Sequence, residues 1–252
     1  LEELRACCAG GVPALTAAIA AALTEEVDSP EGAAAGCWSS GLDFLSWIAD
    51  PSTTPSLAYL CSAPVSYALI YATQLTHYAL TLTNAGVSHA QMHATLKTCT
   101  GHSQGVVTSC IVSSSLTDEE LVSKAAVGAK YMLWQGTRCH QILNTDVAYS
   151  GPAPEASPML AVAGLTVDAV KQVVAAFNAA QGSEVAALSI INNTKETCVS
   201  APTKQLVALR AQIDQVRSYG ASCLAHFPTA TATPDSSLCS QRFFFQKPEL
   251  RA

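Results

Sequence analysis

The sequence predicts an α/β protein, and three observations support this fold class. The chain has 252 residues with 49% hydrophobic content, enough to bury the core of a large domain with a small one beside it. A glycine-flanked turn at residues 101–105 follows a strand-like segment and precedes an apolar helical one. Strand-like and helical segments also alternate between residues 159 and 216, which predicts a small α/β layer.

Helical spacing of apolar residues predicts three helices in the first part of the chain, at residues 12–26, 42–50 and 64–82. The second should end at Asp50, because a residue that precedes proline is pushed out of the helical region. The third should be buried, since its apolar surface is nearly continuous. Its Gln74 and His77 share one face, and we expect structural hydrogen bonds from them.

The centre of the chain carries the turn and a long helix. A strand is expected from Ala94 to Cys99, leading into the turn, and a helix from Val106. Residues 117–120, Thr-Asp-Glu-Glu, form a capping box that should open a helix reaching about Leu143.

Residues 144–158 contain three prolines and predict a connector between two units. The small layer beyond it should comprise strands at 159–163, 185–191 and 198–200 and helices at 166–180 and 202–216.

Composition excludes several classes of function. Only 13% of residues are charged, the net charge is −6 and no basic cluster exists, which argues against a nucleic-acid partner. The longest uncharged run is too weakly apolar to predict a membrane span. Ten cysteines are scattered without a Cys-x-x-Cys pair, so we expect no metal site but small apolar thiols in a reducing compartment.

The Gly-His-Ser-Gln-Gly turn predicts a nucleophile. A sharp strand-to-helix turn projects the Ser103 hydroxyl outward and should leave no room for Cβ atoms at its two glycines. The backbone N–H of Gln104, at the start of the following helix, would stabilise the oxyanion of an acyl-transfer intermediate.

The stretch GHSQGVVTS at 101–109 resembles the nucleophile motif of the acetyl/acyl-transferase domain in the β subunit of fungal-type fatty acid synthases. Further stretches agree with that family in order and spacing, up to about Val216: GLDFLSWIADPSTTP at 41–55, APVSYALIYATQLTHY at 63–78, WQGTRC at 134–139, SPML at 157–160 and IINNTKETCVSAP at 190–202.

The resemblance implies an α/β-hydrolase-like acyltransferase core at residues 1–156 and 218–252, with a ferredoxin-like small subdomain at 157–217 and the active site between them. It also implies a ping-pong transfer from acyl-coenzyme A, through the serine, to the phosphopantetheine arm of an acyl carrier protein. Coenzyme A would be a substrate, with no permanently bound cofactor. The other partners would be further domains of a multifunctional synthase in the cytoplasm, with no membrane.

Four further positions enter the expected substrate site through the resemblance. His102 adjoins the serine. Gln135 stands where malonyl-specific relatives carry a carboxylate-binding arginine, and Arg138 matches an arginine of the acetyl-loading class, so a neutral starter such as acetyl is expected. Asn192 matches an asparagine that could line the cleft or cap a turn.

The family comparison also suggests a chain cut at both ends. The Gly-Gln-Gly segment with a second oxyanion contact would precede residues 2–5, and the base histidine would follow residues 246–249. Neither His102 nor His226 matches that histidine motif, and a serine without its base should be nearly inactive.

Two alternatives compete with acyl transfer to a carrier protein. A serine esterase or thioesterase could use Ser103, Asp168 and His226 in that chain order, although Asp168 suits a helix cap better. A transferase-derived scaffold without catalysis would suit the triple phenylalanine at 243–245, whose rings should pack against another surface.

Overall fold

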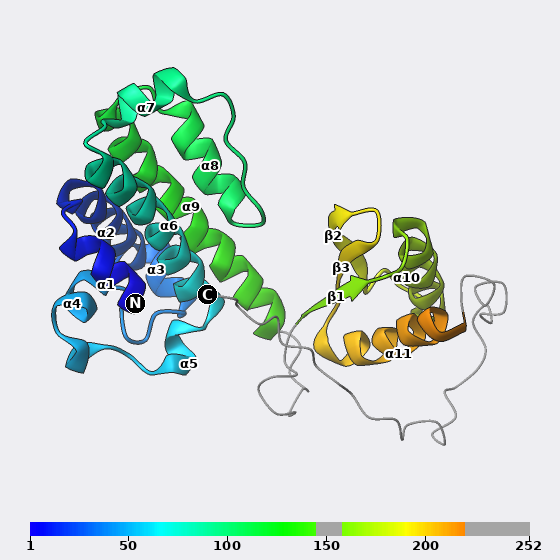
Figure 1. Ribbon diagram of the computed structural model, residues 1–252. Coiled ribbons are helices and arrows are strands. Elements are labelled where there is room, and N and C mark those ends of the chain that lie inside the picture. The colour runs from blue at the N-terminus through cyan, green and yellow to red at the C-terminus, as the bar shows by residue number, and fades with distance from the viewer. Residues whose placement is uncertain (145–157, 220–252) are drawn as a thin grey trace. The chain divides into compact units, whose positions relative to one another are not determined.

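The computed structural model describes residues 1–144 and 158–219 and divides the chain into two compact units, Leu1–Thr145 and Asp146–Ala252 (Figure 1). Each unit has its own hydrophobic core. The connector after residue 144 and the tail from residue 220, including His226 and the triple phenylalanine, lie outside the described residues. The expected return of residues 218–252 to the larger unit therefore stays a prediction.

The described part of the first unit consists of helices. They are α1 (Glu2–Ala9), α2 (Pro13–Val27), α3 (Pro30–Ala35), α4 (Phe44–Ala49), the 3-10 turn η1 (Pro51–Thr53), α5 (Leu57–Leu60), α6 (Ala63–Ala85), α7 (His89–Thr95), α8 (Gly105–Ser114) and α9 (Asp118–Asn144). The helices predicted at 12–26, 42–50, 64–82, from 106 and from 117 are thus confirmed. As expected, α4 ends before Pro51. Helix α6 continues three residues beyond the predicted end, to Ala85, and is followed by Gly86, which has a left-handed conformation.

The strand expected from Ala94 to Cys99 is wrong. A capping box of Ser88 and Gln91 opens α7, which continues to Thr95, and residues 96–102 are irregular. A strand needs a neighbour for its backbone hydrogen bonds, and residues 1–144 contain no other strand. The α/β-hydrolase-like core is consequently not seen in the described residues and remains a prediction.

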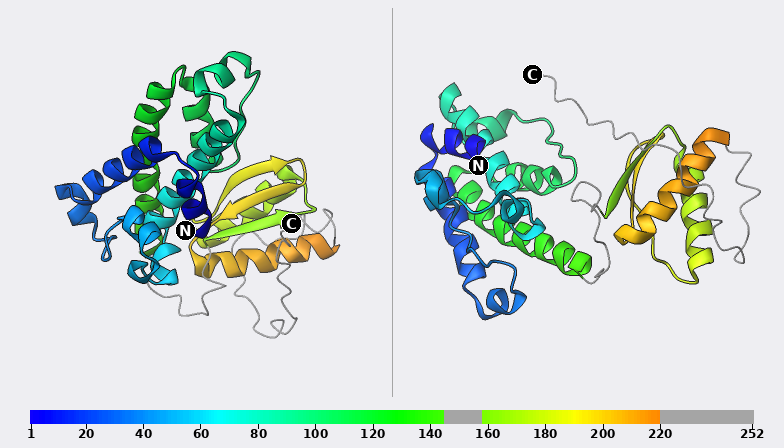
Figure 2. Two further views of the ribbon diagram at one scale, coloured as in Figure 1. Left: turned by 60° about the vertical axis from the view of Figure 1, so that its left-hand side comes forward. Right: turned by 90° about the horizontal axis from the view of Figure 1, so that it is seen from below.

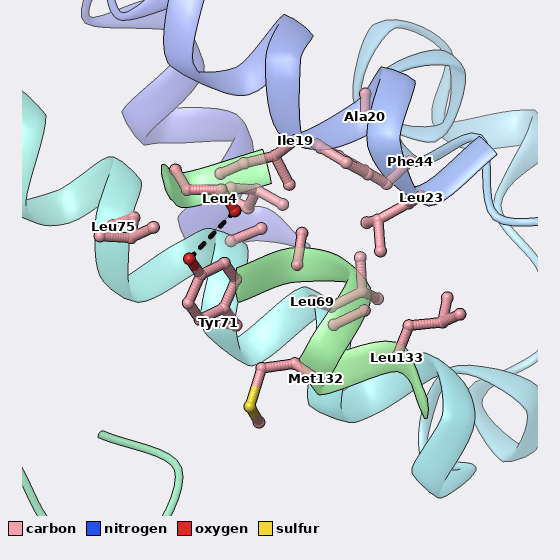
Figure 3. Close-up of a cluster of buried hydrophobic side chains, with 14 of the residues drawn as sticks. Leu4, Ile19, Ala20, Leu23, Phe44, Leu69, Tyr71, Leu75, Met132 and Leu133 are labelled. Carbon is pink, nitrogen blue, oxygen red and sulfur yellow. Dashed lines mark hydrogen bonds between the residues drawn. The ribbon is translucent and has the colours of Figure 1, made fainter. Parts of the chain in front are cut away.

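Helices α6 and α9 form the centre of this unit and lie side by side (Figures 1 and 2). The side chain of Tyr71 on α6 is fully buried, and its hydroxyl donates a hydrogen bond to the carbonyl of Ala125 at 3.0 Å (Figure 3). Gly136 permits the close approach, because a Cβ there would overlap the carbonyl of Ala63. Burial keeps the pKa of the Tyr71 hydroxyl well above its ordinary value, so it stays a donor.

Polar contacts attach α9 to its neighbours. The ammonium of Lys130 contacts Glu25 at 2.6 Å and Glu26 at 3.0 Å, and the Trp134 indole N–H donates to Glu26 at 2.7 Å. At its start, the Thr117 hydroxyl accepts from the Glu120 N–H at 3.2 Å. This half of the predicted capping box is confirmed. The other half is wrong, because the Glu120 carboxylate accepts from the Leu116 N–H rather than from that of Thr117.

The second unit is the predicted α/β layer. Its elements are β1 (Met159–Ala163), α10 (Val167–Gln181), β2 (Ala187–Asn193), β3 (Glu196–Ser200) and α11 (Thr203–Tyr219). The antiparallel sheet has the order β1-β3-β2, with Val199 of β3 paired to Leu160 and Leu188. This β-α-β-β-α run corresponds to the first five elements of the ferredoxin-like pattern.

Candidate active site

The turn at residues 101–105, called the elbow below, shares one feature with a nucleophile elbow, a serine of positive φ at the start of a helix, but no strand precedes it. Among the described residues, Ser103 is the only non-glycine residue with a positive φ, at 53°. This left-handed conformation is unfavourable for a residue with a side chain and persists where the surrounding structure imposes it. The side chain of Ser103 is exposed. The chain therefore holds one strained, accessible hydroxyl at the N-terminus of a helix.

The two glycines of the elbow are not equivalent. A Cβ at Gly101 would overlap the backbone of Gly105 and Val106, so the tight turn requires glycine there. A Cβ at Gly105 would meet no atom within 4 Å. The prediction that both positions lack room is thus confirmed for Gly101 and wrong for Gly105, because the chain folds back over the first glycine only.

Two backbone N–H groups at the start of α8 already donate hydrogen bonds within the turn, and a third does not. Gly105 donates to the His102 carbonyl at 2.9 Å, and Val106 donates to the Ser103 carbonyl at 3.1 Å. The N–H of Gln104 has no hydrogen-bond acceptor among the described residues. It is available to an oxyanion next to Ser103, where the helix N-terminus also favours negative charge.

The elbow is linked to α6 through the next turn of α8. The Thr108 hydroxyl donates to the Gln74 amide oxygen at 2.5 Å, so Gln74 has the structural role expected for it. The Nε2 atom of His77, one turn further on, lies 2.9 Å from the Glu3 carboxylate, at the edge of a groove of about 710 Å³ between α1, α5 and α6. Spacing along the sequence could not have identified Thr108 as the partner of Gln74 or Glu3 as the partner of His77.

The other expected substrate residues lie on α9 of the first unit and on β2 of the second. Gln135 and Arg138 are exposed on α9, and in the described part of the chain no hydrogen bond joins either to the elbow. Asn192 lies on β2 of the second unit, and the turn that follows is capped by Asn193, which accepts from the Lys195 N–H at 2.9 Å. The role of Asn192 stays a prediction.

The residues of the esterase alternative lie in different parts of the chain: Ser103 in the first unit, Asp168 in the second, and His226 outside the described residues. Asp168 is exposed in the first turn of α10 of the second unit, and the N-cap of that helix is Thr166, whose hydroxyl accepts from Ala169. The expected capping role of Asp168 is therefore wrong, since the chain enters the helix two residues earlier. Its closest charged partner is Lys171, at 3.9 Å.

The cysteines are not all apolar fillers. Cys7 is buried, and burial raises the pKa of its thiol, whereas Cys61 and Cys110 are exposed. Eight described cysteines are free thiols. Within residues 1–144 and 158–219, no cluster of histidine, cysteine and acidic side chains could hold a metal ion. No described helix is long and apolar enough to span a membrane.

Sequence reasoning missed a polar cluster at the far end of α8. The Nε2 atom of His93 lies 3.0 Å from the Ser113 carbonyl, the ammonium of Lys124 lies 2.6 Å from the Ser114 carbonyl, and Nε2 of His89 lies 2.8 Å from the Ser115 carbonyl. An i, i+4 pair of histidines on α7 was the available signal, and it was obscured because that segment was expected to be partly a strand.

Comparison with known proteins identifies the family of this chain. A family model described as starter unit:ACP transacylase in aflatoxin biosynthesis matches residues 13–222. The fatty acid synthase subunit beta of Saccharomyces cerevisiae is 30% identical over 190 residues, which cover 71% of this chain and 9% of the relative. That of Schizosaccharomyces pombe is 30% identical over 192 residues, covering 73% and 9%.

The fatty acid synthase beta subunit aflB of Emericella nidulans is 29% identical over 176 residues, covering 67% of this chain and 8% of the relative. The chain thus spans less than a tenth of the length of these curated relatives. The resemblance to the transferase region of fungal fatty acid synthase β subunits is confirmed. With a family model matched from Pro13 to residue 222, the chain belongs to the starter unit:ACP transacylase family.

Proposed function

We propose that this chain transfers a starter acyl group, with acetyl the expected group, from coenzyme A to an acyl carrier protein through an ester on Ser103. The observation that carries the proposal is the strained, exposed conformation of Ser103 at the start of α8, with the Gln104 N–H beside it. Membership of a transacylase family supports the same reaction class. Both features suit covalent acyl transfer.

In the first half-reaction, the Ser103 oxygen attacks the thioester carbonyl carbon of acyl-coenzyme A. The oxyanion accepts a hydrogen bond from the Gln104 N–H, the carbon–sulfur bond breaks, and coenzyme A leaves as a thiol with the serine proton. In the second half-reaction, the phosphopantetheine thiol attacks the ester, and its proton returns to the Ser103 oxygen. We assign the relay of these protons to no described residue.

The proposed preference for a neutral starter rests on Gln135. A malonyl group carries a free carboxylate, which needs a bidentate cationic partner, and a neutral amide cannot supply one. Arg138 lies three residues further along the same helix face, at the position shared with acetyl-loading relatives. We also propose His102 and Asn192 as substrate contacts.

The setting of the reaction is proposed from the relatives. These relatives are fatty acid synthase β subunits, and this chain corresponds to a small share of their length. We therefore propose that other synthase domains accompany it in the cytoplasm and that a carrier protein presents the phosphopantetheine arm. Coenzyme A would exchange as a substrate, without a resident cofactor.

The test is acyl loading of the full-length protein that contains this chain. We expect radiolabelled acetyl-coenzyme A to label the peptide that carries Ser103 and malonyl-coenzyme A to label it weakly. The label should disappear in Ser103→Ala and persist in Ser113→Ala, which removes an exposed hydroxyl from the same helix. Addition of phosphopantetheinylated carrier protein should transfer the label.

Three results would contradict the proposal. Hydrolysis of a nitrophenyl ester at Ser103 without transfer to a carrier protein would favour the esterase. No label at Ser103 in the full-length protein would favour a scaffold role. Preferential loading from malonyl-coenzyme A would overturn the assignment of Gln135, while the acyl-enzyme itself would stand.

A further inference from the structure

We infer that the side chains of His89, His93 and Lys124 form a clamp that positions the nucleophile helix from its far end. Each donates to one of three successive carbonyls at the C-terminus of α8: His93 to Ser113, Lys124 to Ser114 and His89 to Ser115, at 3.0, 2.6 and 2.8 Å. The clamp joins α8 to α7 on one side and to α9 on the other. The inference rests on the proposed role of Ser103.

The donors suit the end of the helix where they lie. The last carbonyls of a helix have no partners within it and carry partial negative charge, so N–H donors and a cation stabilise them. His89 must donate through Nε2, since a carbonyl only accepts. Its Nδ1 lies 2.8 Å from the Tyr78 hydroxyl, so both ring nitrogens of His89 have a partner and the orientation of the ring is fixed.

The donors are themselves held by α9 and its N-terminus. The backbone N–H of His89 donates to the Asp118 carboxylate at 3.0 Å. The Lys124 ammonium also contacts the Glu120 carboxylate at 3.0 Å, which in turn accepts from the Leu116 N–H. That backbone hydrogen bond, together with Lys124, holds the pKa of Glu120 below its ordinary value, so the pair stays charged.

The clamp adds to a modest apolar contact. Val112 is the one buried residue of α8, Val107 and Ile111 are partly buried against the core, and Val106 on the same helix is 48% exposed. Thr108 provides the other polar attachment, to Gln74 of α6. A helix of ten residues is about 15 Å long and behaves as a rod. If the C-terminal end of α8 is loosened, its N-terminal end therefore changes direction. Ser103 lies at that N-terminal end, and its unfavourable φ must be imposed by its surroundings.

The experiment uses the full-length protein with Lys124→Met and His93→Leu, which remove the donors while keeping side chains of similar bulk. Lys124→Arg and His93→Gln retain a donor and serve as rescue variants. Lys130→Met is the matched control, because it removes an ammonium six residues further along α9 that contacts Glu25 and Glu26 but not α8. Hydrogen exchange of the α8 amides, thermal unfolding and the rate of Ser103 acetylation are measured for each.

We expect the α8 amides to exchange about tenfold faster in Lys124→Met and His93→Leu. Acetylation should slow by about tenfold at saturating acetyl-coenzyme A with KM unchanged, because a small displacement of a nucleophile lowers the rate and not substrate binding. The rescue variants should restore both. Lys130→Met should lower the unfolding temperature without altering either property of α8.

The inference is overturned if both donor-removing variants leave the exchange of α8 unchanged, whatever the activity. It is also overturned if they lower the unfolding temperature while folded molecules acetylate Ser103 at the original rate, since the contacts would then be structural only. Absence of acetylation in the unmodified protein would contradict the proposed function instead, and the exchange measurement would still test whether the clamp holds α8.

Discussion

Helices α6 and α8 pack against the same helix, α9, in different ways. Nine residues of α6 are buried, and its close approach to α9 is fixed by Gly136 and by the buried Tyr71 hydroxyl. In α8 one residue is buried, and the helix is attached by hydrogen bonds at Thr108 and at its C-terminal carbonyls. The scaffold helix is held mainly by buried apolar residues, whereas the site helix combines partly buried Val107 and Ile111 with polar contacts, and its other side is exposed to solvent.

The largest effect should come from breaking the elbow at Gly101. A Cβ at this position would overlap the backbone of Gly105, which can be relieved only by opening the turn. Because displacement of a nucleophile by about 1 Å can cost 10²-fold in rate, Gly101→Ala should reduce Ser103 acetylation by at least about that factor. A time course of peptide labelling measures it.

Gly105→Ala is the control for this change. The space around that Cβ is open, and alanine is favoured over glycine in a helix by up to about 1 kcal/mol, so stability should not fall. Equal loss of labelling in both variants would contradict the steric account of the elbow. Loss in Gly105→Ala with unchanged stability would indicate that the open space receives the substrate.

A second and smaller effect is expected in the scaffold. Gly136→Ala on α9 would place a Cβ against the carbonyl of Ala63 and close to Tyr67, and overpacking of this kind costs about 1–3 kcal/mol. The helical preference of alanine offsets part of it, so we expect a net loss of about 1–2 kcal/mol in the free energy of unfolding. Denaturant titration measures the loss. Ser123→Ala, an exposed change on the same helix, should leave stability nearly unaltered, and a stable Gly136→Ala would refute the close approach.

Local signals in the sequence predicted the scaffold better than the site. The proline after Asp50 and the glycine after α6 marked helix ends correctly, because each restricts its own backbone. The prediction of a strand before the elbow was wrong because a strand forms only beside a partner strand. The local sequence does not show whether such a partner exists. The contacts that hold α8 join residues 34 positions apart at Gln74 and Thr108 and 26 apart at His89 and Ser115, beyond any helical or strand period.

The smallest effect should appear when the strain at Ser103 is released. Glycine adopts a φ of 53° without penalty, whereas a residue with a Cβ pays on the order of 1–2 kcal/mol there. Glycine also gains more freedom in the unfolded chain, which offsets about 0.4–1 kcal/mol. Ser103→Gly should therefore be more stable than Ser103→Ala by up to about 1 kcal/mol, and both should fail to become acetylated. Thermal unfolding of the two variants measures this difference in stability. Because both variants lack the hydroxyl, its loss does not contribute to the difference. If Ser103→Ala proves the more stable, the elbow stores no strain, and the exposed serine owes its position to the contacts of α8 alone.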